Sequence, residues 1–208
     1  MVKNIGFWML LIVITACQNN EGPNQNRTHL LHDYSPLDEE GHVQAVVEIP
    51  AGTLQKWEVE KETGELEWEI KDGQRRVVDY LSYPGNYGMI PQTYLPSDKG
   101  GDGDPLDVLI LGEATKRGEI LPCEIIGVLK LLDRGEIDDK LIAVPVEGPF
   151  SAVESMKELN EDYPGAQVII ETWFTSYKGP DKMESLGFEE RESAIQIFNQ
   201  AISDYKTN

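Results

Sequence analysis

The feature that most limits the possible folds is a succession of short apolar segments, rich in β-branched residues and separated by Gly, Pro and Asp. The clearest of these segments are residues 42–49, 105–111, 120–132 and 141–146. Short strands that alternate with tight turns are typical of small all-β domains. The spacing therefore predicts a small β-barrel that closes on itself.

Residues 56–70 add two alternating segments on either side of Glu62-Thr63-Gly64. Period-two alternation around a glycine turn predicts a β-hairpin. Asp72 and Gly73 mark a further turn. The β-branched residues and Tyr80 in the stretch 76–81 favour extended structure.

The pattern becomes helical after Pro149. Apolar residues recur at helical spacing over 166–177, and Gly179 and Pro180 end that run. A second helix is predicted around 194–205, with Glu189, Glu190 and Glu192 near its start, and a shorter one at 152–159 before Pro164. The predicted fold is mainly β, with helices following the barrel.

The first residues resemble a secretory signal: Lys3 precedes an apolar run from Ile5 to Ile14. This run is shorter than the ~20 residues that a membrane-spanning helix needs. The run Ile14-Thr15-Ala16-Cys17 resembles a bacterial lipobox, so we expect residues 1–16 to be a signal peptide and Cys17 to carry a lipid anchor. The alternative is an ordinary or uncleaved signal with an incidental cysteine.

Residues 17–40 are poor in apolar side chains and predict a flexible tether, which leaves 41–208 as the folded domain. Lipidation would place this domain outside the cytoplasm, anchored to a membrane of the bacterial cell envelope. It would also leave Cys123 as the one remaining thiol, so we expect no disulfide within the chain. Cys123 lies in an apolar run and is expected to be buried.

Acidic residues gather at two places in a chain that has 37 acidic and 18 basic side chains and a net charge of −19. Asp102, Asp104 and Asp107 lie in a glycine-rich loop, and Asp133 and Asp138 follow a predicted strand. Such carboxylates repel each other unless a hard cation binds between them. Each cluster taken alone is more often a solvated turn, because Asp and Gly are the usual turn residues. The charge excludes nucleic acid as a partner.

Basic and hydroxyl-bearing side chains form a third set, near Gly and Pro turns. These residues are Lys56, Arg75, Arg76, Tyr83, Tyr87, Lys140, Tyr177 and Lys178. Lys and Arg combined with a metal suit a phosphate ligand. The alternative is that the tyrosines pack against turns and that Lys178 interacts with a helix C-terminus.

The order of motifs from Glu48 to Lys178 resembles the soluble, metal-dependent, barrel-type inorganic pyrophosphatases of family I. The motifs that carry this resemblance are Glu48-Ile49-Pro50, Lys56-Trp57-Glu58, Tyr83 to Gly88, Gly101 to Leu109, Gly127 to Asp133, Asp138-Asp139-Lys140, and Trp173, Phe174, Tyr177 and Lys178. The resemblance implies a five-stranded OB-like barrel with flanking C-terminal helices.

The resemblance also implies roles for single residues. Asp102, Asp107 and Asp138 would hold the tighter metals, Asp133 with Asp138 a metal that arrives with substrate, and Asp104 would be the general base. The groups on the phosphates would be Lys56, Arg76, Tyr87, Lys140, Tyr177 and Lys178, with Glu58 as a metal ligand and Glu48 and Tyr83 in the outer shell.

The chain departs from the family pattern at Arg134, where an acidic residue is usual, which leaves the number of metals open. The choice between Arg75 and Arg76 is also open, although the run from Arg76 to Asp79 favours Arg76.

The expected activity is hydrolysis of diphosphate to two orthophosphates by a metal-activated water, with several Mg²⁺ ions or Mn²⁺ as a substitute. We also expect a homo-oligomer, because relatives form dimers or hexamers. Two rival hypotheses are a non-catalytic, surface-anchored lipoprotein that binds divalent metal or phosphate, and a structural lipoprotein with solvated acidic loops.

Overall fold

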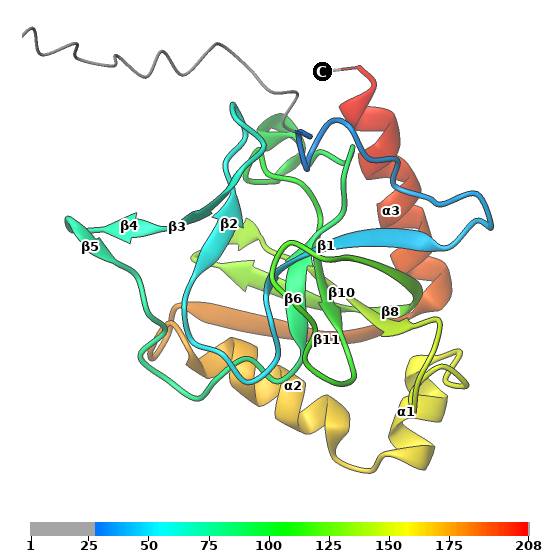
Figure 1. Cartoon of the computed structure of the whole chain (residues 1–208). Coiled ribbons are helices and arrows are strands. Elements are labelled where there is room, and N and C mark those ends of the chain that lie inside the picture. The colour runs from blue at the N-terminus through cyan, green and yellow to red at the C-terminus, as the bar shows by residue number, and fades with distance from the viewer. Residues whose placement is uncertain (1–27, 208) are drawn as a thin grey trace, which may run out of the picture.

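The structure, a computed structural model, describes residues 28–207 (Figure 1). The predicted signal peptide at 1–16, the predicted lipidation site Cys17 and the first part of the predicted tether lie outside the described residues.

Five strands pair in a closed ring. They are β1 (Val43–Ile49), β6 (Asn86–Met89), β7 (Asp107–Ile110), β10 (Lys140–Pro145) and β8 (Ile120–Asp133). β1 pairs with β6, β6 with β7, β7 with β10 and β10 with β8, and the start of β8 returns to β1. The parallel pair is β7–β10, and the other four pairs are antiparallel. This ring confirms the predicted five-stranded barrel.

The strand β6 was not predicted. Its sequence, Asn86-Tyr87-Gly88-Met89, lacks the β-branched residues that mark the other strands. A Cβ atom on Gly88 would lie 1.8 Å from the carbonyl oxygen of Val46 on β1. The glycine that hides this strand in the sequence is therefore what allows β6 to approach β1.

Two small hairpins lie outside the barrel. β2 (Trp57–Val59) pairs with β3 (Leu66–Trp68), and β4 (Ile70–Lys71) pairs with β5 (Gln74–Arg75). The first hairpin was predicted, and so was the turn at Asp72-Gly73 that joins β4 to β5. The stretch 76–81 forms one isolated bridge, between Gln55 and Val77, rather than a strand.

β11 (Met183–Glu190) extends the sheet beyond the barrel by pairing with the second half of β8, which also pairs with the short β9 (Glu136–Ile137). β11 was not predicted. Glycine and three glutamates obscure its strand pattern, and its register shifts between Ser185 and Gly187. Glu189 and Glu190 therefore belong to a strand and not to the first turn of the last helix.

The helices are α1 (Met156–Asp162), α2 (Ala166–Ser176) and α3 (Arg191–Tyr205), and a 3-10 turn, η1, covers Ser97–Lys99. α2 and α3 confirm the two main helical predictions and cover different sides of the barrel (Figure 1). α1 begins later than predicted because the side chain of Ser155 caps it, accepting a hydrogen bond from the Glu158 amide at 3.1 Å. Among residues 28–207, no helix is long and apolar enough to cross a membrane.

Residues 28–40, predicted as part of the flexible tether, lie against the barrel. Leu31 is buried and packs in a cluster with Val46, Val59 and Met89. The amide of Leu30 donates a hydrogen bond of 3.1 Å to the carbonyl of Gly64 in the β2–β3 turn. Two adjacent leucines thus anchor a segment whose overall composition is polar. Cys123 is fully buried, as predicted, in the described part of the chain.

Candidate active site

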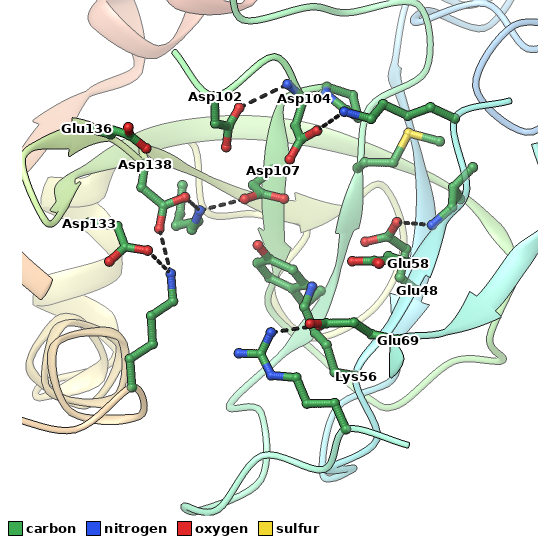
Figure 2. Close-up of a pocket in the computed structure, with 18 of the residues that line it drawn as sticks. Glu48, Lys56, Glu58, Glu69, Asp102, Asp104, Asp107, Asp133, Glu136 and Asp138 are labelled. Atoms are coloured by element: carbon green, nitrogen blue, oxygen red, sulfur yellow. Dashed lines mark hydrogen bonds and ion pairs between the residues drawn. The ribbon is translucent and has the colours of Figure 1, made fainter. Parts of the chain in front are cut away.

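One pocket of about 480 Å³ brings the predicted site residues together. It is lined by Glu48, Lys56, Glu58, Arg76, Tyr87, Asp102, Asp104, Asp107, Asp133, Asp138, Lys140, Tyr177 and Lys178. Tyr83 does not line the pocket and is buried behind Tyr87, with 5.1 Å between the ring centroids. Figure 2 shows the carboxylates converging from several separate chain segments.

The register of the barrel sets the charge at the pocket floor. Asp107 begins β7 and Lys140 begins β10, and the parallel pairing places them side by side. The ammonium of Lys140 donates to Asp107 and, at 2.5 Å, to Asp138. Burial by itself would lower the pKa of Lys140, but Asp107 and Asp138 outweigh it and raise that pKa. Lys140 is therefore a buried permanent cation.

The loop from Asp102 to Asp107 holds its carboxylates close together. The amide of Asp104 donates to the Asp102 carboxylate at 3.0 Å. Gly103 takes a positive φ of 82°, which favours glycine. Burial, with the charges of Asp104 and Asp107, raises the pKa of Asp102. A bound cation would stabilise the ionised carboxylates and so oppose the rise in the pKa of Asp102.

Asp133 ends β8 and Asp138 follows β9, so the β8–β9 hairpin brings both to the pocket. Lys178 lies 2.7 Å from Asp133 Oδ2 and 3.4 Å from Asp138 Oδ2. The other oxygen of Asp133, Oδ1, is buried and makes no hydrogen bond within the described chain. An orphaned carboxylate oxygen among other carboxylates fits a divalent cation with oxygen ligands.

The opposite wall comes from β1 and the β2–β3 hairpin. Glu48 Oε1 accepts a hydrogen bond from the Val59 amide at 2.7 Å, and burial raises the pKa of Glu48 to about 7. Burial also raises the pKa of Glu58. The ammonium of Lys56 lies 5.4 Å from the centroid of the Tyr87 ring.

Arg76 lies in this pocket and Arg75 does not. Arg76 Nη1 lies 2.6 Å from Glu69 Oε2, whereas the guanidinium of Arg75 stacks outside on Trp68, 4.9 Å from the ring centroid. The alternation of a short strand end turns the two neighbours to opposite sides. The sequence left open which of the two arginines belongs to the site, and the pocket contains Arg76.

Four further charged residues line the pocket that were not predicted: Glu60, Lys61, Glu69 and Glu136. Lys61 lies in the β2–β3 turn and donates to the Asp104 carboxylate and, at 3.2 Å, to the carbonyl of Gly103. The hydrogen bond to Asp104 raises the pKa of Lys61. The sequence signal for Lys61 was weak, because a lysine in a hairpin turn is usually exposed to solvent.

The arrangement unites hard oxygen ligands with buried cations and tyrosine hydroxyls, which suits a metal-bound phosphate. In addition, the inorganic pyrophosphatase family model matches residues 45–206. The chain belongs to this family. Its reaction is the hydrolysis of diphosphate, and the family uses a divalent metal.

The chain is also similar to individual members of the family. The inorganic pyrophosphatase of Campylobacter jejuni is 34% identical over 169 residues, which cover 79% of this chain and 92% of that protein. The inorganic pyrophosphatase of Picrophilus torridus is 32% identical over 212 positions, covering 99% of both chains. The crystal structure of type I inorganic pyrophosphatase from Toxoplasma gondii superposes with a TM-score of 0.82 at 27% identity, covering 87% of this chain and 88% of that one.

Another group of possible metal ligands, Asp38, Glu40 and His42, lies in the turn before β1. None of these three residues lines the pyrophosphatase pocket. The Asp38 carboxylate accepts hydrogen bonds from the Glu40 and His42 amides, at 3.0 and 2.8 Å, and contacts the His42 ring. These contacts account for the cluster as a stabilised turn.

Proposed function

We propose that this pyrophosphatase is Mg²⁺-dependent and that Asp102, Asp107, Asp133, Asp138 and Glu58 hold the metals. The observation that carries this proposal is the set of pocket carboxylates, which includes a buried oxygen of Asp133 that has no hydrogen-bond partner among residues 28–207. All of these ligands are hard oxygens, the type that Mg²⁺ prefers. Bound Mg²⁺ would neutralise diphosphate and lower the pKa of the attacking water.

The basic side chains would hold the two phosphates. Lys140 and Lys178 contact Asp138, and Lys56 and Arg76 also line the pocket, so that four cations are available to the two phosphates. The hydroxyls of Tyr87 and Tyr177 complete the set as hydrogen-bond donors, and burial raises the pKa of Tyr87, which keeps its hydroxyl protonated. These groups would stabilise the negative charge that develops on the leaving phosphate.

Asp104 would accept or orient the proton of the attacking water. Its side chain is half exposed, at 52%, so water can reach it. Lys61 contacts both Asp104 and the adjacent carbonyl of Gly103 and would hold the carboxylate in one orientation. In this proposal the loop from Asp102 to Asp107 contributes two metal ligands, Asp102 and Asp107, and one base, Asp104.

An assay of phosphate release separates this proposal from its rivals. The full chain is incubated with diphosphate and Mg²⁺, with a chelator, and with Ca²⁺. We expect release with Mg²⁺, none with the chelator, and inhibition by Ca²⁺ because of its looser coordination. A non-catalytic metal-binding protein would be stabilised by Mg²⁺ without releasing phosphate, and a structural lipoprotein would respond to neither addition.

We further propose that the enzyme is lipid-anchored through Cys17 in the bacterial cell envelope, where it would act on diphosphate outside the cytoplasm, and that it is a homo-oligomer. The run Ile14-Thr15-Ala16-Cys17 supports the anchor. An anchored assembly must direct every N-terminus toward one membrane, which restricts its symmetry. Sedimentation of the detergent-solubilised chain would determine the oligomeric state.

A further inference from the structure

The loop between Leu95 and Asp104 is closed at its base by two backbone hydrogen bonds. The amide of Leu95 donates to the carbonyl of Asp104 at 2.9 Å, and the amide of Gly103 donates to the carbonyl of Leu95 at 2.9 Å. Residues 96–102 project between these bonds, and we call them the loop tip. The tip contains η1 and Gly100-Gly101. Because glycine gives the backbone more accessible conformations, the tip needs contacts with other elements to hold one position.

Within residues 28–207, two hydrogen bonds connect the loop tip to other elements. The amide of Ile137 in β9 donates to the carbonyl of Gly100 at 3.1 Å. The ammonium of Lys99 donates to Asp204 Oδ1, in the last turn of α3, at 2.6 Å. The C-terminal helix therefore contacts the tip through one ion pair, between residues that are 105 positions apart in the sequence.

Asp204 lies where a helix disfavours a negative charge. The carbonyl end of the helix dipole repels anions, and the last turn of α3 contains no basic residue. The residue is also buried, and a buried carboxylate requires a compensating cation. Lys99 provides that cation, and Gln200 donates to the same oxygen of Asp204 at 2.9 Å. Because the aspartate by itself destabilises the helix, its contribution to the fold lies in the contact with Lys99.

The position of the tip determines the position of Asp102. In the described chain, the Asp102 carboxylate accepts one hydrogen bond, from the amide of Asp104 in the same loop, at 3.0 Å. Asp107, in contrast, begins β7 and is fixed by pairing with β6 and β10. Both carboxylates line the pocket (Figure 2). A shift of the tip would therefore move Asp102 relative to Asp107.

We propose that Lys99 and Asp204 are positioning residues, which hold Asp102 where it can share a Mg²⁺ ion with Asp107. This inference rests on the proposed function, in which Asp102 and Asp107 are metal ligands. Mg²⁺ requires near-ideal octahedral geometry with ligands at about 2.0–2.1 Å, so a small displacement of one ligand weakens binding. The ion pair thus connects α3, which contributes no residue to the pocket, to the metal site.

The test measures Mg²⁺ binding to the full chain by calorimetry, without diphosphate, in Lys99→Met and Asp204→Asn. The first variant removes a positive charge and the second removes a negative one. An effect of charge alone would strengthen Mg²⁺ binding in Lys99→Met and weaken it in Asp204→Asn. A positioning role instead weakens binding in both variants, and we expect a loss of about tenfold in each.

Three further variants complete the test. The double variant should bind no more weakly than either single one, because the pair is already broken. Lys99→Arg keeps a cationic donor and should bind like the parent. Lys157→Met, which breaks an exposed ion pair with Glu161 outside the pocket, is the control and should also bind like the parent. Urea unfolding in chelator should give midpoints close to that of the parent, because Lys99 is half exposed.

Asp102→Asn separates this inference from the proposed function. If it and the two variants of the pair all bind Mg²⁺ more weakly, both are supported. If Asp102→Asn alone weakens binding, or if Lys99→Met binds Mg²⁺ more tightly than the parent, the positioning role is overturned and the metal site stands. If Asp102→Asn binds like the parent, Asp102 is not a metal ligand, and the positioning role is overturned with it.

Discussion

The aspartates of this pocket differ in their exposure to solvent and in the lysine that each one contacts. Asp104 is more exposed than Asp107 or Asp138, with side-chain exposures of 52%, 28% and 13%, and its charge partner is Lys61. The two more buried aspartates are instead paired with Lys140. One loop and one hairpin thus provide carboxylates in different environments, which is what separate roles as ligand and base require.

We expect Asp104→Asn to lower kcat for diphosphate by about 10²- to 10⁴-fold, because an amide cannot accept the proton of water. The free energy of unfolding should change by no more than about 1 kcal/mol, since the lost ion pair is exposed. Steady-state kinetics and urea unfolding measure the two quantities. Asp98→Asn, outside the pocket, is the control. Turnover close to that of the parent would remove Asp104 from the role of base.

We expect Lys61→Met to lower kcat by about tenfold with KM changed less than twofold, because Lys61 orients Asp104 instead of holding phosphate. Lys61→Arg keeps a donor to Asp104 and should recover most of kcat. Initial rates over a range of diphosphate concentrations separate the two constants. A rise in KM at unchanged kcat would show that Lys61 binds substrate directly.

Glu48 links the stability of the metal-free protein to pH. Its pKa is raised to about 7 by burial, so the folded state holds its proton more tightly than the unfolded state. This contribution to stability is complete below about pH 4.5 and is lost as pH rises through about 7.

We therefore expect Glu48→Gln to stabilise the metal-free protein at pH 8 by about 2–3 kcal/mol and to have little effect at pH 4.5. The amide oxygen can still accept the hydrogen bond from Val59. Urea unfolding in chelator at both pH values measures the difference. Equal effects at both pH values would contradict the raised pKa of Glu48.

At the scale of elements, the long strand β8 and the β2–β3 hairpin organise the site. β8 pairs with β1 at its start and with β10 and β11 further on, and it ends at Asp133. The hairpin carries Lys56 and Glu58 on its first side and Lys61 in its turn. The loop of this hairpin packs closely against the N-terminal segment. If Gly64 carried a Cβ atom, that atom would lie 2.6 Å from the Cα atom of His29.

Two truncations test this support. Removing residues 1–27 should leave stability and kcat unchanged in a purified soluble form, because residues 1–16 are the predicted signal peptide and residues 17–27 are poor in apolar side chains. Removing residues 1–36 takes away Leu31 and should lower the free energy of unfolding by about 2–4 kcal/mol. It should also lower kcat, because the turn that holds Lys61 loses its contact with Leu30. Identical stability of the two truncated forms would show that residues 28–36 do not support the turn.

At the scale of the whole molecule, the net charge of −19 makes the few basic residues informative. The diphosphate pocket contains five of them: Lys56, Lys61, Arg76, Lys140 and Lys178. A polyanionic substrate approaches such a protein against a repulsive field unless metal neutralises it first. Carboxylates outnumber these cations in the pocket, so diphosphate would need bound metal as well as the Lys and Arg side chains.

The anchor is a property of the whole chain and is tested in bacterial cells. We expect the parent chain to fractionate with membranes and to be released by detergent, because a diacylated cysteine binds bilayers strongly. Cys17→Ala should abolish lipid labelling and membrane association, while the folded domain keeps its activity. Membrane association that survives Cys17→Ala would favour an uncleaved signal instead.

The sequence predicted the parts of this protein whose signal is local. Short apolar runs rich in β-branched residues located β1, β7, β8 and β10, because a strand that is buried on both faces carries few polar side chains, and helical spacing located α2 and α3. The sequence missed β6 and β11, where glycine and glutamate interrupt that pattern. It also extended the tether over residues 28–40, because two leucines are too few to shift the composition of a polar segment.

For the site, the order of motifs identified the family and its candidate residues, because each motif is a contiguous stretch of sequence. The tertiary structure alone brought Asp107 beside Lys140, placed Arg76 inside the pocket and Arg75 outside, and joined Lys61 to Asp104 across 43 residues. Charge pairing depends on distance through space, and barrel closure sets that distance independently of separation along the chain.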